Sequence, residues 1–159
     1  MALRQIREMG DPILEKKSKE VKEITPRLKE LLDDMWDTLH DAQGVGLAAV
    51  QVGILKRLFI VEISEDEKYT FVNPRIVLSE GEQTDYEGCL SVPGKVGKVT
   101  RPDHVIIEAF DEHMNPITVE GNELLARAMC HEFDHLEGRV YVDLVEGGLY
   151  DADAVPEED

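Results

Sequence analysis

The segment His131-Glu132-Phe133-Asp134-His135 carries the residue types best suited to chemistry in this sequence of 159 residues. An HExxH pattern on a helix places its two imidazoles one turn apart on the same face, where both can bind one metal ion. An unpaired carboxylate on a buried helix face is costly. The pattern therefore predicts a metal-bound water as the partner of Glu132, although HExxH by itself also occurs by chance.

A helical projection separates the chemistry of this segment from its ordinary charges. At 100° per residue, four side chains fall within about 60° of one another: Leu124, Ala128, His131 and His135. Glu132 lies beside them, in the same arc as Leu125 and Leu136, whereas Glu123, Arg127 and Asp134 point away. The projection predicts a buried stripe that contains the ionisable groups of the motif.

Two histidines leave a catalytic metal one protein ligand short. The HExxHxxGxxH pattern is only partly present. Gly138 matches its glycine, but Tyr141 occupies the position of the third histidine. Cys130 is turned about 120° from the midpoint of the two histidines and cannot reach the same ion. A glutamate later in the chain is another possible ligand, but the residues after His135 leave little room for a further helix to position it. Cys89, which follows a glycine, is the remaining candidate.

The segment from Gly44 to Gly53 matches the GxGxxA pattern of dinucleotide-binding proteins. That pattern should follow a strand and open a helix, whereas here a helical pattern precedes it and Gly53 interrupts any helix. Two interpretations remain. One is a tight turn with close backbone packing, and the other is a loop that brings Gln51 against the metal site, where a neutral amide could donate to an oxyanion.

Taken together, these segments resemble the peptide deformylase family, whose motifs are GxGxAAxQ, EGCLS and a helical HExDH. Here they read Gly44 to Gln51, Glu87 to Ser91 and His131 to His135. The resemblance implies an α+β fold with small mixed and antiparallel sheets around the HExxH helix. It also implies a metal-dependent hydrolase that removes the formyl group from nascent N-formylmethionyl peptides. An HExxH endopeptidase and a non-catalytic metal-binding module are the alternatives.

The resemblance also implies roles for single residues. Cys89, His131 and His135 would hold one divalent metal, Fe²⁺ in the cell, with Zn²⁺, Ni²⁺ or Co²⁺ able to replace it. Glu132 would be general base and then acid, and the Gln51 side chain and the Leu90 backbone N–H would form the oxyanion hole. The implied substrate contacts are Val45 and Gly46 with the peptide backbone, Glu87 and Gly88 near the methionine end, and Leu124, Arg127 and Ala128 around the methionine side chain.

Two features depart from the family pattern. Cys130 stands where the family commonly has glutamine. Because this position points away from the metal, we expect an effect only on packing or on the residues that surround the metal ligands. Some relatives carry a longer C-terminal helix that is associated with ribosome docking, whereas this chain continues into an acidic tail.

The elements that must position these residues follow an α+β order. A helix is predicted from Thr25, its cap, and Pro26 to about Asp41, ending near Gly44. Asn122 should cap a second helix over 123–136. Strands are predicted over 58–63, 69–72, 76–78, 105–110 and 117–120, mostly antiparallel, with a turn at 111–115.

Composition limits the partners of the chain. Hydrophobic residues make up 42% and charged residues 32%, as in a soluble globular protein, so we expect one domain over 1–150 and a frayed acidic tail over 151–159. The net charge of −17 excludes broad neutralisation of nucleic-acid phosphates. Transient contact with the ribosome would need a local patch such as Lys95, Lys98 and Arg101, and the alternative is that peptides are met after they leave the ribosome surface. Two cysteines, no signal peptide and no apolar span predict a cytoplasmic protein without membrane contact.

Overall fold

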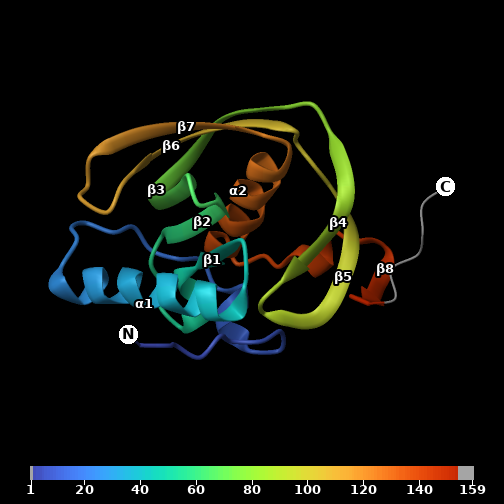
Figure 1. Ribbon diagram of the computed structural model, residues 1–159, viewed down its shortest axis with the longest axis horizontal. Helices are drawn as coiled ribbons and strands as arrows, with labels where there is room; N and C mark the ends of the chain where they lie inside the picture. Colours follow the sequence, from blue (N-terminus) through green and yellow to red (C-terminus); the bar gives the residue numbers. More distant parts are fainter. Residues whose placement is uncertain (1, 154–159) are drawn as a thin grey trace.

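The computed structural model describes residues 2–153 and builds them from two α-helices, eight strands and three short 3₁₀ helices. The α-helices are α1 (Pro26–Ala42) and α2 (Glu123–Leu136), and the 3₁₀ helices are η1 (Pro12–Glu15), η2 (Ala49–Val52) and η3 (Tyr141–Asp143). The strands are β1 (Gly46–Ala48), β2 (Leu58–Ser64), β3 (Glu67–Glu80), β4 (Gln83–Cys89), β5 (Val92–Arg101), β6 (His104–Phe110), β7 (Pro116–Asn122) and β8 (Glu146–Asp151). Figure 1 shows α2 near the centre of the molecule, with α1 and the β4–β5 hairpin on different sides of it.

The first predicted helix is confirmed at both ends. The Thr25 side chain accepts a hydrogen bond from the backbone N–H of Leu28 at 3.2 Å, and Pro26 occupies the first turn. The helix ends at Ala42 because Gln43 adopts a left-handed conformation, with φ of 55°. Within residues 2–153, no helix combines the length and apolar character that crossing a membrane requires.

A five-stranded antiparallel sheet, in the order β1-β2-β3-β6-β7, separates the two helices. Alternation along β2 explains how one strand serves both. Phe59 and Val61 belong to the hydrophobic cluster that includes α2 residues, whereas Leu58 and Ile60 belong to the cluster that includes α1 residues. The continuous apolar run of β2 is therefore buried on both faces of the sheet.

The strands predicted over 69–72 and 76–78 are a single strand, β3. The pairing of β3 with β6 shifts register between Val72 and Arg75, at Asn73-Pro74. Asn73 has φ of 50°, and its side chain hydrogen-bonds both the N–H and the carbonyl of Val21. Proline has no N–H to donate to a β-ladder, so the sequence pattern at Asn73-Pro74 predicts the end of a strand, although the strand continues there.

The second sheet, β4-β5-β8, was not predicted. Its central strand contains proline and two glycines, a composition that weakens any strand pattern in the sequence. The tail was predicted to fray from Asp151, and this is wrong at its start, because Asp151 pairs with Lys95 in the ladder between β5 and β8. Residues 154–159 of the predicted tail lie outside the described residues.

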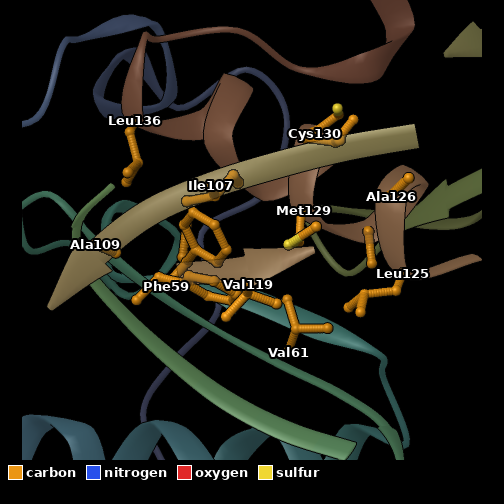
Figure 2. Close-up of a cluster of buried hydrophobic side chains, with 14 of the residues drawn as sticks. Phe59, Val61, Ile107, Ala109, Val119, Leu125, Ala126, Met129, Cys130 and Leu136 are labelled. Atoms are coloured by element: carbon orange, nitrogen blue, oxygen red, sulfur yellow. The ribbon is translucent and has the colours of Figure 1, made fainter. Parts of the chain in front are cut away.

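The predicted bounds of α2 are confirmed, and its packing largely follows the helical projection. Figure 2 shows Met129 directed towards Phe59 and Val119 of the sheet, in the cluster that holds Leu125 and Leu136. Asn122 occupies the cap position, but its side chain makes no capping hydrogen bond.

The projection is wrong for two residues of α2. Leu124 is 51% exposed, because it lies in the first turn at the rim of a cavity. Arg127 is only 5% exposed, because the second sheet covers this side of the helix and supplies hydrogen-bond acceptors there.

Candidate metal centre and substrate cavity

Three potential metal ligands converge where β4 ends against α2. One ligand atom each from Cys89, His131 and His135 lies within 4.8 Å of the other two. The Cys89 Sγ and His135 Nε2 atoms are 3.4 Å apart. Cys130 is not part of this group. Its side chain is buried, and burial raises the pKa of its thiol to about 11.

The residues at this point fit a divalent metal. His131 donates from Nδ1 to the Glu87 carboxylate, which leaves its Nε2 as the ligand atom, and carboxylate-bound imidazoles of this kind are usual at metal centres. A thiol and two imidazoles form a donor set suited to zinc and to other late first-row metals. Three protein ligands leave a further coordination position for water or substrate.

Glu132 faces the same point from α2. The residue is 4% exposed, and its Oε1 atom is buried without a hydrogen-bond partner among the described residues. Its Oε2 atom lies 3.8 Å from His131 Nε2. Burial raises the pKa of Glu132 to about 7. The carboxylate is thus directed at the ligand group, while the hydrogen-bonding capacity of its Oε1 atom is unused.

Position 46 of β1 approaches this carboxylate closely. A Cβ atom at Gly46 would lie 2.7 Å from Glu132 Oε2 and 2.9 Å from Cδ. Any side chain at this position would displace Glu132, so glycine is needed for the close approach of β1 to α2.

Behind the ligands lies a buried ionic cluster centred on Glu87. Its carboxylate accepts hydrogen bonds from Arg101 at 2.6 and 3.1 Å, from Arg127 at 2.7 Å and from His131. Arg101 also donates to Asp134 at 2.6 Å. Although burial opposes it, His131 and Arg101 hold the pKa of Glu87 far below its usual range. The cluster ties β4, β5 and α2 together beside the metal ligands.

Replacing Glu87 with alanine is expected to lower the free energy of unfolding by about 3–5 kcal/mol, because two guanidinium groups would remain buried without their shared partner. Denaturant unfolding of the two proteins measures the difference. Glu108 is the matched control, since it pairs with Arg75 on the surface and Glu108→Ala should cost below about 1 kcal/mol. Equal losses of unfolding free energy in the two variants would contradict the conclusion that the buried cluster stabilises the fold.

The ligand pair on α2 has opposite electrostatic environments. Burial alone would lower the pKa of His131, but Glu132, Cys89 and Glu87 raise it well above the ordinary value. Burial and the neighbouring His131 lower the pKa of His135 well below the ordinary value. Neutral imidazole is the form that binds metal, and at His135 the protein favours that form.

Of the two interpretations of the segment Gly44–Gly53, the loop that carries Gln51 to the ligands agrees with the structure. β1 is followed by the short helix η2, and Gln51 within it is 1% exposed. Its amide nitrogen donates to Cys89 Sγ at 3.5 Å. Leu90 follows Cys89 in the turn between β4 and β5, and it lines the same cavity as the ligands.

A cavity of about 450 Å³ opens beside the ligands. All seven residues that the resemblance implies for substrate contact line it: Val45, Gly46, Glu87, Gly88, Leu124, Arg127 and Ala128. Val45 and Leu124 are 41% and 51% exposed and form apolar parts of its wall. A larger hollow of about 810 Å³ beside the start of α1 contains none of the ligands. The smaller cavity is therefore the one that can present a substrate to them.

The local basic patch predicted at Lys95, Lys98 and Arg101 does not exist in that form. Arg101 is 5% exposed and paired with Glu87 and Asp134. Lys95 pairs with Asp151, and Lys98 lies over the Tyr86 ring at 5.7 Å from its centre. The prediction failed because the acidic partners come from segments distant in the sequence.

Some residues around the ligands were missed or assigned elsewhere. Arg101 was predicted only as a surface cation, and nothing in the local sequence indicates its buried pairing with Glu87. Tyr141 is 1% exposed, and its ring centre lies 5.9 Å from that of His131. Ser91 belongs to the EGCLS segment and is fully buried, so its position beside Cys89 was the available signal.

Comparison with known proteins gives a consistent result. The family described as polypeptide deformylase matches residues 3–148. Proteins named peptide deformylase from Lachnoclostridium phytofermentans and Agathobacter rectalis are 53% and 55% identical, covering 100% and 95% of this chain and 99% and 95% of theirs. A crystal structure of a peptide deformylase from Legionella pneumophila is similar with a TM-score of 0.89 and 41% identity, over 92% of this chain and 88% of that one. A peptide deformylase from Ehrlichia chaffeensis in complex with actinonin also gives a TM-score of 0.89, at 34% identity, over 92% and 91% of the two chains.

Proposed function

The chain belongs to the polypeptide deformylase family, and from this membership we propose which of its residues carry the reaction. The activity itself is the metal-dependent hydrolysis that removes the N-formyl group from nascent peptides. The observation that supports our assignment is the convergence of Cys89, His131 and His135 within 4.8 Å, beside the buried carboxylate of Glu132.

Cys89, His131 and His135 hold the metal, and we assign Fe²⁺ as the ion in the cell, with Zn²⁺, Ni²⁺ or Co²⁺ able to occupy the site. When bound, such an ion acts as a Lewis acid and lowers the pKa of a water molecule towards neutrality. A ferrous centre with a thiolate ligand is open to oxidation. The activity of the iron form should therefore decay in air.

Glu132 accepts a proton from the attacking water and later delivers it to the departing amine. Its unpartnered Oε1 atom and its position between His131 and Gly46 support this role. The products are formate and a free methionyl N-terminus. Because β1 comes so close, the carboxylate has little freedom to turn away from the ligand group.

Gln51 and the Leu90 backbone N–H stabilise the oxyanion that forms on the formyl oxygen. The Gln51 amide supports this role because it is neutral, buried and already directed at Cys89. A charged donor would compete with the metal for its ligands, whereas an amide does not.

The peptide lies in the 450 Å³ cavity, with its backbone along Val45 and Gly46 of the β1 region. The methionine side chain is placed against Leu124, Arg127 and Ala128, and Glu87 and Gly88 lie near the methionine end. Because two guanidinium groups and the His131 imidazole already donate to the Glu87 carboxylate, we assign to this residue a backbone contact with the peptide. We also place the protein in the cytoplasm, without direct binding of nucleic acid, and a transient contact with the ribosome would have to use a surface other than Lys95, Lys98 and Arg101.

The test is an assay of formate release from formyl-Met-Ala-Ser by protein purified without oxygen. We expect full activity before chelation, loss of activity after the metal is removed, and recovery with Fe²⁺. Exposure of the iron form to air should abolish activity, whereas a Ni²⁺ or Zn²⁺ form should persist. Cleavage within unformylated peptides would instead favour an endopeptidase. Formate release that survives complete chelation would contradict the assigned metal centre.

A further inference from the structure

The Gln51 amide is held in one orientation by three polar partners. Its Oε1 atom accepts from the backbone N–H of Ala48 at 2.9 Å. Its Nε2 atom donates to Ser91 Oγ at 3.0 Å and to Cys89 Sγ at 3.5 Å. Because a backbone N–H can only donate, the oxygen end of the amide must face Ala48 and the NH₂ group must face the metal ligands.

Of the two acceptors of the NH₂ group, Ser91 is the closer. Its hydrogen bond to Gln51 is also the one that can persist during the reaction. Cys89 is one of the three assigned metal ligands. The N–H that points at Cys89 is the one that would donate a hydrogen bond to a substrate oxygen beside the metal. Ser91 then remains as the only side-chain partner of the Gln51 nitrogen among the described residues. Ser91 is fully buried, so no solvent molecule can take its place without a rearrangement.

The backbones of both residues are fixed by a single segment near the N-terminus. The backbone N–H of Arg7 donates to the Gln51 carbonyl at 2.6 Å, and the backbone N–H of Met9 donates to the Ser91 carbonyl at 2.7 Å. η2 and the turn before β5 are therefore held side by side independently of the side-chain bond. Removing the Ser91 hydroxyl would free the NH₂ end of the amide, while the oxygen stays bonded to Ala48 and the backbone that carries the side chain stays in place.

We propose that Ser91 is a positioning residue for the reaction, and that its hydroxyl fixes the Gln51 amide so that one N–H points at the developing oxyanion. The proposal rests on the proposed role of Gln51 in the oxyanion hole. It assigns to Ser91 no contact with the substrate and no proton transfer. Its effect should therefore appear in kcat, and it should disappear when Gln51 is absent.

The test is a double-mutant cycle on the metal-loaded enzyme with formyl-Met-Ala-Ser as substrate. Ser91→Ala should lower kcat about tenfold, less than the 10²–10³-fold that losing an oxyanion donor costs, with KM unchanged within about twofold. In the Gln51→Ala background the same substitution should change kcat by less than about twofold, because its target is gone. Metal content and thermal unfolding of each variant check that the site is loaded and the protein folded.

Ser18→Ala is the matched control. Ser18 is also a buried serine, but its Oγ atom has no hydrogen-bond partner among the described residues, so kcat and KM should remain at the parent values. A second measurement is the ¹H–¹⁵N signal of the Gln51 side-chain amide, assigned by its loss in Gln51→Ala. This signal should shift in Ser91→Ala and stay in place in Ser18→Ala.

Three results would overturn the proposal, by two different routes. If Gln51→Ala lowers kcat but Ser91→Ala does not, or if Ser91→Ala costs the same factor in both backgrounds, the positioning role of Ser91 fails and the proposed oxyanion hole stands. If Gln51→Ala leaves kcat unchanged, the proposed role of Gln51 fails and the role of Ser91 falls with it.

Discussion

Glu132→Gln is expected to yield a folded, metal-containing protein that releases formate from formyl-Met-Ala-Ser on the order of 10³-fold more slowly than the parent. Glutamine has the shape of glutamate but cannot accept the proton of the attacking water. The loss should fall on kcat, because the substitution leaves the cavity walls and the ligand atoms unchanged. Formate release and metal content, measured on the same preparations, give the two quantities.

The surroundings of Glu132 explain why this substitution should act on chemistry alone. The carboxylate is 4% exposed, one of its oxygens has no hydrogen-bond partner among the described residues, and it is not one of the three converging ligands. Its removal therefore breaks no hydrogen bond of the Oε1 atom. A neutral amide also suits a buried site better than an unpaired charge does, so stability should be maintained or slightly increased.

Glu123→Gln is the matched control, since Glu123 begins the same helix with its side chain exposed. The same chemical change at this position should leave formate release at the parent rate. Retention of activity by Glu132→Gln, with metal bound, would contradict the assignment of the proton acceptor. It would instead mean that another group accepts the proton of the attacking water.

The convergence of Cys89, His131 and His135 agrees with the sequence prediction because the information that leads to it is local. His131 and His135 share a face by helical periodicity alone, and the search for a third ligand leads to Cys89 by eliminating Tyr141 and Cys130. The same periodicity correctly buries Ala128 beside them. What the residues alone left open was the segment that carries Gln51, and there the resemblance to a family was needed to prefer one interpretation.

The predictions that were wrong have a different physical origin. They concern charged side chains that are buried because they pair with residues distant in the sequence. Arg127 and Arg101 look like surface cations in the sequence because an unpaired guanidinium would not be buried. Their partner Glu87 lies 40 residues from Arg127 and 14 from Arg101. Since strands β4 and β5 themselves contain glycine, proline and lysine, neither the sheet nor its ion pairs could be predicted from local patterns.

Cys89→Ala is expected to remove the metal and, with it, the activity. The substitution takes away one of three converging ligands, so the affinity should fall by more than the 10–100-fold typical of losing an outer partner of a ligand. Metal content after dialysis measures this loss directly. In the cobalt-loaded parent, the sulfur-to-metal charge-transfer absorption should be present, and in Cys89→Ala it should be absent even at saturating cobalt.

Cys130→Ala provides the control, because it is the other cysteine of the chain and adjoins the ligand His131. Its thiol is buried and lies outside the ligand group, so this variant should keep its metal, its charge-transfer absorption and its rate of formate release. A Cys89→Ala variant that keeps stoichiometric metal and full activity would require a different third ligand, as in an HExxH endopeptidase. Loss of the metal from Cys130→Ala instead would mean that the neighbour of His131, and not the residue after Gly88, completes the site.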